Sequence, residues 1–183
     1  MEFSNKKKGI CMVCGNTNQE LFQNLAICSL CWSPSEKFCS LEAPEIDKIT
    51  EHIYLGNVAA QKQKALLKIL KITHILVVGL ELEIFHSNDF VYKKLEIDDS
   101  FFEGIKNYFE ETYKFIEEAN GNVFVHCMWG ISRSPTIVIA YLMRKEKKGF
   151  EEIFSFVKSK RKWANPNDGF KEQLMELEEK LKQ

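Results

Sequence analysis

Short apolar runs alternate with amphipathic patterns along the chain from about residue 49 to its C-terminus. Four runs have the length and the β-branched content of strands, and each is bounded by turn residues. One of them, Thr73–Val78, is continuously apolar, which is typical of a strand that is buried on both faces of a sheet. We predict strands at residues 49–55, 73–78, 91–97 and 122–125.

Apolar positions spaced three and four apart predict helices between and after these strands. The clearest pattern runs from Ile105 to Ile116 and is closed by Asn120-Gly121, a common helix-ending pair. We predict helices at residues 58–70, 105–116, 135–143, 151–161 and 169–181. Strands that alternate with helices indicate an α/β fold, with a central, mostly parallel twisted sheet flanked by helices.

The composition is that of a globular protein that can build a core. Hydrophobic residues make up 45% of the 183 residues, charged residues 28%, and the net charge is -1. This balance gives no support for a role on nucleic acids or membrane surfaces, and no apolar run approaches the length of a membrane span. Met1–Gly9 is polar and lysine-rich, unlike a secretory signal. We expect a monomeric cytoplasmic and/or nuclear protein without a nucleic-acid or membrane partner.

The six cysteines are divided unevenly along the chain. Five lie within the first forty residues, and Cys127 stands alone. This segregation predicts a small module at residues 1–42 and a larger domain at residues 46–183, separated by a polar stretch that contains Pro44.

Four of the early cysteines form two C-x2-C pairs, Cys11 with Cys14 and Cys28 with Cys31, separated by thirteen residues. Two such pairs can supply four thiolates to one tetrahedral Zn²⁺. So small a segment has little core of its own, and a bound metal would supply its folding free energy. Because four thiolates leave no open position, we expect the zinc to be structural.

Other interpretations of the early cysteines remain open. The pairs could form disulfides in an oxidising compartment or serve as redox motifs. The remaining Cys39 could be an unreactive thiol or a regulatory partner of Cys127. The module could dock on the larger domain or bind another protein, and Trp32 and Phe38 are candidates for either contact.

Residues 126–134, His-Cys-Met-Trp-Gly-Ile-Ser-Arg-Ser, lie between a predicted strand and a predicted helix. A cysteine at such a turn faces backbone N–H groups and a helix N-terminus, which attract anions and favour the thiolate. Arg133 can form a planar fork on phosphate oxygens, and the Ser134 hydroxyl could hydrogen-bond the Cys127 thiolate. The expected phosphate-binding residues are Met128, Trp129, Gly130, Ile131, Ser132 and Arg133, with Gly130 allowing a tight loop. The stretch therefore predicts a phosphate site with a nucleophile.

This stretch resembles the HCxxGxxR(S/T) signature of the cysteine-dependent protein tyrosine phosphatases, and its HCxxGxSRSP form is most similar to the dual-specificity phosphatases. The resemblance extends to residues 52–56 (HIYLG), 72–76 (ITHIL) and 166–170 (PNDGF), the last followed by Gln173-Leu174. Together these segments cover roughly residues 46 to 182. The resemblance implies a protein phosphatase that hydrolyses phosphotyrosine and phosphoserine or phosphothreonine in a phosphoprotein substrate.

The resemblance also implies roles for single residues. Cys127 would attack phosphorus and form a cysteinyl-phosphate, and Arg133 would bind the phosphoryl oxygens. Ser134 would assist release of the thiolate, while His126 would hold the loop and help tune the ionisation of the thiol. Aligning residues 92–97 with the family places Asp99 at the general acid, although Asp98 is an alternative. No catalytic metal is implied.

Two departures from the family pattern bear on the site. Gly79 stands near a position where many relatives carry a polar residue, so a supporting hydrogen bond could differ. Met128 and Trp129 are uncharged where related lipid phosphatases tend to carry basic residues, which favours proteins over polyanionic lipids as substrates. Trp129 could pack beneath the loop or line the pocket.

Alternative functions remain from the sequence alone. The chain could hydrolyse a non-protein phosphate monoester, such as an RNA 5′-phosphate, a lipid or a carbohydrate. It could be a phosphate-binding adaptor with weak turnover. The cysteine-rich module could also be the main functional part, acting as a partner-binding element.

Overall fold

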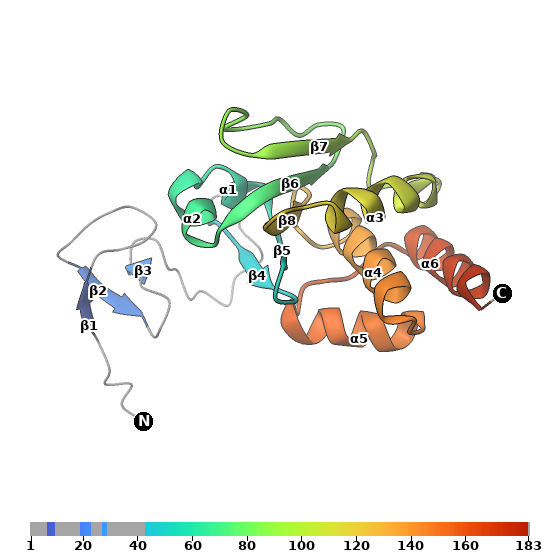
Figure 1. Cartoon of the computed structure of the whole chain (residues 1–183). Coiled ribbons are helices and arrows are strands. Elements are labelled where there is room, and N and C mark those ends of the chain that lie inside the picture. Colours follow the sequence, from blue (N-terminus) through green and yellow to red (C-terminus); the bar gives the residue numbers. More distant parts are fainter. Residues whose placement is uncertain (1–6, 10–18, 23–26, 29–42, 183) are drawn as a thin grey trace, which may run out of the picture.

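The computed structural model describes residues 7–9, 19–22, 27–28 and 43–182 (Figure 1). The early segments form a three-stranded antiparallel sheet in the order β1-β2-β3. Its strands are β1 (Lys7–Gly9), β2 (Gln19–Phe22) and β3 (Ile27–Cys28). Of the four predicted zinc ligands, only the backbone of Cys28 belongs to a described strand. Cys11, Cys14 and Cys31 lie outside the described residues, so the zinc site stays a prediction.

Residues 43–182 contain a five-stranded mixed sheet in the order β4-β5-β8-β6-β7 (Figure 1). The strands are β4 (Ile46–Lys48), β5 (Ile53–Gly56), β6 (Ile72–Val78), β7 (Val91–Leu95) and β8 (Asn122–His126). The β4–β5 pair is antiparallel, and the other neighbours are parallel. Five residues of β6 and four of β8 are buried, because helices cover both faces of the sheet. The predicted α/β architecture is confirmed.

Two hydrophobic cores lie on opposite faces of this sheet. The helices are α1 (Val58–Gln61), α2 (Lys64–Ile69), the 3₁₀ helix η1 (Ile105–Tyr108), α3 (Phe109–Glu117), α4 (Arg133–Glu146), α5 (Phe150–Lys160) and α6 (Asp168–Leu181). One core contains Leu67 of α2 and Ala60 of α1 packed against Phe124. The other contains Ile137 of α4 and Leu174 of α6, together with Cys127. Cys127, which directly follows β8, thus belongs to the core on the α4 face of the sheet.

The structure corrects two of the predicted elements. The helix expected at residues 58–70 is two helices, because Gln63 has a non-helical backbone with φ -93° and ψ 72°. The strand expected at 49–55 begins only at Ile53, and a separate strand, β4, precedes it. The apolar pattern does not predict β4, because this strand lies at the sheet edge and contains the charged residues Asp47 and Lys48.

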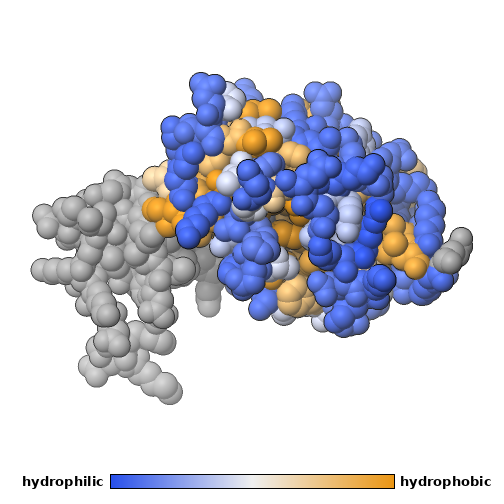
Figure 2. All heavy atoms as spheres, in the orientation of Figure 1, coloured by the Kyte–Doolittle hydropathy of each residue, from blue (hydrophilic) through white to orange (hydrophobic). Residues whose placement is uncertain are grey.

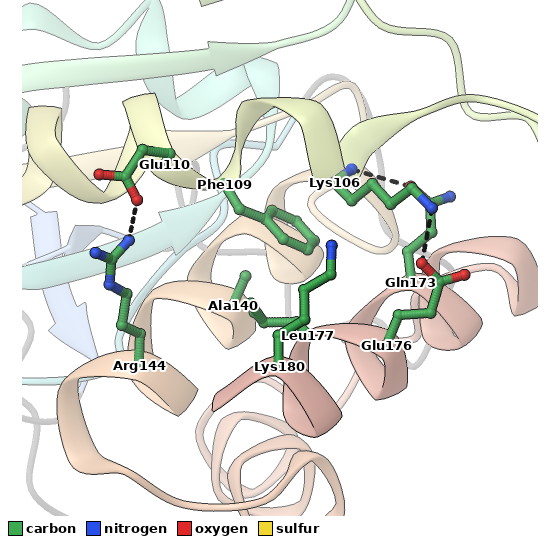
Figure 3. A pocket seen from close by; sticks show the side chains of 9 residues that line it. All are labelled: Lys106, Phe109, Glu110, Ala140, Arg144, Gln173, Glu176, Leu177 and Lys180. Carbon is green, nitrogen blue, oxygen red and sulfur yellow. Dashed lines mark hydrogen bonds and ion pairs between the residues drawn. The ribbon is translucent and has the colours of Figure 1, made fainter. Parts of the chain in front are cut away.

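The helices η1, α3, α4 and α6 pack around a groove (Figure 3). Phe109, Ala140 and Leu177 supply its apolar lining. The ion pairs at its edges are Lys106 with Glu176 and Arg144 with Glu110. Such exposed pairs each contribute less than about 1 kcal/mol, so apolar burial carries most of this packing.

The outer surface is polar over most of the visible face, with scattered hydrophobic side chains (Figure 2). Within the described part of the chain, no helix combines the length and the apolar composition that a membrane crossing requires.

Candidate active site

The loop between β8 and α4 surrounds the sulfur of Cys127. The Cys127 residue is 2% exposed. The N–H of Gly130 donates to Sγ over 3.2 Å, and the Ser134 hydroxyl donates to Sγ over the same distance. Helix α4 begins at Arg133, so its N-terminal end also faces the loop. Two hydrogen-bond donors and a helix N-terminus therefore surround this sulfur, an arrangement that attracts anions to the loop.

Gly130 has a backbone conformation that other residues avoid. Its φ is +66°, and a Cβ at this position would lie 2.4 Å from the carbonyl oxygen of Gly56. The expectation that the loop needs a permissive backbone at Gly130 is therefore confirmed. The close approach lets the loop pack directly on the end of β5.

Arg161 holds the loop from the side opposite to the sulfur. This side chain is 1% exposed, and its Nε donates to the Gly130 carbonyl over 2.7 Å. Its Nη2 donates to the Trp129 carbonyl over 2.9 Å. Asp47 and Glu45 pair with the guanidinium at 2.6 and 2.9 Å. Burial alone would lower the pKa of Arg161, but the two carboxylates outweigh burial and raise it.

Arg133 presents its guanidinium to the same loop from the first turn of α4. Glu81 accepts from both Nη atoms, at 2.8 and 2.6 Å, and the Ile97 carbonyl accepts from Nη1 at 3.1 Å. The buried Nε has no hydrogen-bond partner within the described chain. Gly79 leaves the room for this arrangement, because a Cβ there would lie 2.8 Å from Nη1. Glycine in place of the polar residue that many relatives carry near this position therefore leaves space for the Arg133 guanidinium.

Asp99 reaches the loop through its side chain, whereas Asp98 makes a hydrogen bond to Glu103 through its backbone. Oδ1 of Asp99 accepts from the Ser132 hydroxyl at 2.7 Å and from the Asn167 side-chain amide at 2.8 Å. Oδ2 lies 3.8 Å from Nε of Arg133. The backbone N–H of Asp98 donates to Glu103. One Asp99 oxygen is therefore anchored, and the other faces the arginine.

His126 supports the loop as a neutral imidazole. It is fully buried, and burial lowers its pKa to about 4. Nδ1 lies 3.3 Å from the Cys127 carbonyl oxygen. With the Gln61 amide oriented to satisfy its neighbours, its nitrogen lies 3.0 Å from Nε2. His126 therefore contributes hydrogen bonds to the loop and no positive charge at neutral pH.

Met128 and Trp129 occupy different surroundings. Met128 packs against the core on the α1–α2 face, and its carbonyl accepts from the Val58 N–H at 3.2 Å. Trp129 is 40% exposed, which excludes packing beneath the loop. An exposed indole two residues after Cys127 can contact what enters the site.

Three residues of this site, Arg161, Glu81 and Gln61, were not found from the sequence. They lie in three separate segments of the chain, and each is of a type that is common on protein surfaces. Asn167 stood within the PNDGF segment, where the resemblance assigned it no role. Only the fold brings these side chains to the loop.

A comparison with protein families matches the dual-specificity phosphatase catalytic domain to residues 53–180. The chain belongs to the dual-specificity phosphatase family. It is 41% identical to dual specificity protein phosphatase 1B of Arabidopsis thaliana over 140 residues, which cover 75% of this chain and 84% of the relative. It is 45% identical over 136 residues to dual specificity protein phosphatase 1 of the same plant, covering 73% of this chain and 69% of the relative.

Solved structures of the family share the fold of this phosphatase. The structure of DUSP15 matches with a TM-score of 0.68 and 34% identity, covering 75% of this chain and 94% of that one. The human tyrosine phosphatase-like serine/threonine/tyrosine-interacting protein matches with a TM-score of 0.71 and 32% identity, covering 75% and 98%. The chain is thus a phosphoric monoester hydrolase, a protein phosphatase for phosphotyrosine and phosphoserine or phosphothreonine.

Proposed function

We propose that Cys127, Arg133 and Asp99 carry out this protein phosphatase reaction in two displacements at phosphorus. In the first, the Cys127 thiolate attacks phosphorus, an S–P bond forms and the ester P–O bond breaks. Asp99 gives its proton to the departing oxygen of the substrate side chain. The product of this step is a cysteinyl-phosphate and a free hydroxyl on the protein substrate.

In the second displacement, water replaces the sulfur. The Asp99 carboxylate takes a proton from the attacking water, a new P–O bond forms and the S–P bond breaks. The electron pair returns to the sulfur as a thiolate, towards which the Gly130 N–H and the Ser134 hydroxyl are directed. Inorganic phosphate leaves. The loop N–H groups and Arg133 bind the oxygens of phosphorus in both displacements.

One observation carries these assignments. Asp99 is held by Ser132 and Asn167 through a single oxygen, while its second oxygen stays 3.8 Å from Arg133. An acid that is anchored at one oxygen can present the other to a leaving group without rotating. This arrangement supports Asp99 as the acid in preference to Asp98.

Three substitutions test the mechanism. Cys127→Ser is expected to abolish hydrolysis of phosphopeptides and of p-nitrophenyl phosphate. Asp99→Asn is expected to slow phosphoserine peptides by about 100-fold and activated aryl phosphates far less, because activated leaving groups need no proton. Asp98→Asn is the matched control and should behave like the wild type. If Asp98→Asn shows the leaving-group dependence instead, the assignment of the acid is wrong.

We propose protein substrates rather than RNA, lipid or carbohydrate phosphates for the same site. Met128 and Trp129 add no positive charge beside the nucleophile, where a polyanionic headgroup would favour it. Turnover of phosphopeptides should exceed that of phosphoinositides and RNA 5′-phosphates in a common panel. A preference for any of the latter would overturn this substrate class.

We also propose that Cys11, Cys14, Cys28 and Cys31 bind one structural Zn²⁺. Two C-x2-C pairs supply the soft thiolate donors that Zn²⁺ prefers, and no position remains for substrate. The test is metal analysis of the full chain. One equivalent of zinc is expected in the wild type and none in a Cys11→Ser/Cys28→Ser variant, with activity on p-nitrophenyl phosphate retained. Absence of zinc from wild-type protein purified without chelators would refute the proposal.

A further inference from the structure

The five N–H donors of the Arg133 guanidinium are divided into two groups. Glu81 and the Ile97 carbonyl accept from three of them: one on each Nη towards Glu81, and the second on Nη1 towards Ile97. The remaining donors are the Nε–H and the second hydrogen of Nη2, which lie parallel on one edge of the guanidinium. The buried Nε has no hydrogen-bond partner among the described residues.

The free edge has the geometry that two phosphate oxygens require. An arginine binds phosphate through two parallel N–H groups, and the Nε–Nη2 edge is one such pair. Its Nε lies 3.8 Å from Oδ2 of Asp99, so this edge faces the side of the loop that holds the acid. The opposite end of the guanidinium is taken up by Glu81, and the two interactions do not compete for the same hydrogens.

Glu81 is charged in this arrangement. Its hydrogen bonds to Arg133 lower the pKa of the carboxyl, which is 39% exposed at its side chain. Gly79 has no side chain that could restrain the arginine, since only an added Cβ there would come within 2.8 Å of Nη1, and the Ile97 carbonyl holds one hydrogen of the same Nη1. Without Glu81, the guanidinium would keep a single acceptor, Ile97, and could rotate about its Cδ–Nε bond.

We propose that Glu81 is a positioning residue that locks the Arg133 guanidinium with its Nε–Nη2 edge towards the phosphoryl group. The proposal rests on the function assigned above to Arg133. Glu81 touches neither the substrate nor the sulfur; it acts on the transition state through the arginine. Its effect is expected in the step where the equatorial oxygens of phosphorus move into one plane and need two aligned donors.

A second effect of Glu81 has the opposite sign, and this makes the proposal testable. A carboxylate beside Arg133 reduces the net positive charge that a phosphate dianion meets. If charge were the main effect, removal of Glu81 would tighten the binding of phosphate and vanadate. If orientation is the main effect, removal weakens the interactions made only in the transition state and leaves ground-state binding nearly unchanged.

The experiment compares Glu81→Ala and Glu81→Gln with the wild type on p-nitrophenyl phosphate. The expected kcat is about 10-fold lower for Glu81→Ala and about 3-fold lower for Glu81→Gln, which keeps one acceptor oxygen, with KM within about 2-fold. The inhibition constant of vanadate, which mimics the five-coordinate transition state, should rise in parallel with the loss of kcat. The inhibition constant of inorganic phosphate should change by less than about 2-fold.

Glu83→Ala is the matched control, because it removes an exposed carboxylate from the same segment. It should leave all four constants unchanged. Thermal unfolding of each variant verifies that it is folded. If Glu81→Ala does not fold, Glu81→Gln, which keeps the size of the side chain, still tests the proposal.

The proposal is overturned by a kcat within 2-fold of the wild type in Glu81→Ala. It is equally overturned if vanadate binds more tightly, or if vanadate and phosphate weaken by the same factor. An inactive wild type, or an active Cys127→Ser protein, would instead refute the proposed mechanism and leave a different signature.

Discussion

Nε of Arg161 donates a hydrogen bond of 2.7 Å to the carbonyl oxygen of Gly130. In a trans peptide the carbonyl and the following N–H point in opposite directions. By holding the carbonyls of Trp129 and Gly130 behind the loop, Arg161 directs the next N–H groups forward. The first of these is the Gly130 N–H, which donates to the Cys127 sulfur. A buried arginine thus orients the donors of the phosphate site from behind.

Arg161→Met should cost both stability and activity. It leaves Glu45 and Asp47, which are 26% and 41% exposed, without their cation and two loop carbonyls without their donor, and the loss should be about 1–3 kcal/mol. The loop carbonyls also lose their donor, so kcat/KM should fall at least about 10-fold. Urea unfolding and p-nitrophenyl phosphate kinetics measure the two effects. Lys160→Met, an exposed neighbour, is the control, and an Arg161→Met protein as stable as this control would contradict the assignment.

Asn167 is expected to position the acid as well as to cap a helix. Its side-chain oxygen accepts from the Phe170 N–H at the start of α6, while its nitrogen donates to Asp99. Asn167→Asp keeps the capping oxygen and removes the donor, whereas Asn167→Ala removes both and costs about 1 kcal/mol of stability.

Both Asn167 variants should therefore slow phosphoserine peptides about 10-fold more than p-nitrophenyl phosphate. Only Asn167→Ala should show the loss of the helix cap in urea unfolding. Equal slowing of the two substrates would show that Asn167 does not act through Asp99.

The stability of the protein should depend on the charge of His126 between about pH 6.5 and pH 4. Burial lowers the folded-state pKa of His126 to about 4, against about 6.5 when unfolded. In this window the unfolded chain binds the proton more readily. The stabilisation is therefore complete above about pH 6.5 and is lost as the pH falls to about 4, by about 3 kcal/mol in total.

His126→Gln lacks this titration but keeps hydrogen-bonding capacity towards the loop. Its free energy of unfolding in urea should fall less than that of the wild type between pH 7 and pH 4. The carboxylates that titrate in the same range are common to both proteins and cancel in the difference. Parallel curves would mean that His126 is protonated in the folded state.

Gly130→Ala tests the contact between the loop and β5. A methyl group there would lie 2.4 Å from the Gly56 carbonyl oxygen, and φ of +66° disfavours a side chain. The loop must shift, which moves the N–H that faces the Cys127 sulfur. We expect kcat/KM to fall by at least about 100-fold. Gly149→Ala, in which only the end of the Glu178 side chain must move, should remain active.

The local chemistry of the site was readable from the sequence because it lies on one contiguous segment. Cys127, Gly130, Arg133 and Ser134 are positioned by a strand-to-helix turn, which the apolar run of β8 and the helical pattern after Pro135 predict. The buried strands were also predicted from contiguous segments, because a continuous apolar run of strand length indicates a strand that is buried. Asp99 was singled out through the resemblance, and the fold brings its side chain to Ser132 and Asn167.

By itself the sequence determined four of the five strands of the larger sheet, the predicted phosphate loop around Cys127, and the family. Tertiary structure alone decided which distant side chains orient that loop. Arg161 meets Asp47, which lies 114 positions away, and Glu81 meets Arg133 across 52 positions. An isolated arginine or glutamate carries no periodic or local signal of its partner, because the pairing depends on how β4, β6, α4 and α5 converge. Hydrophobic patterning specifies the elements, and only their packing brings those charges together.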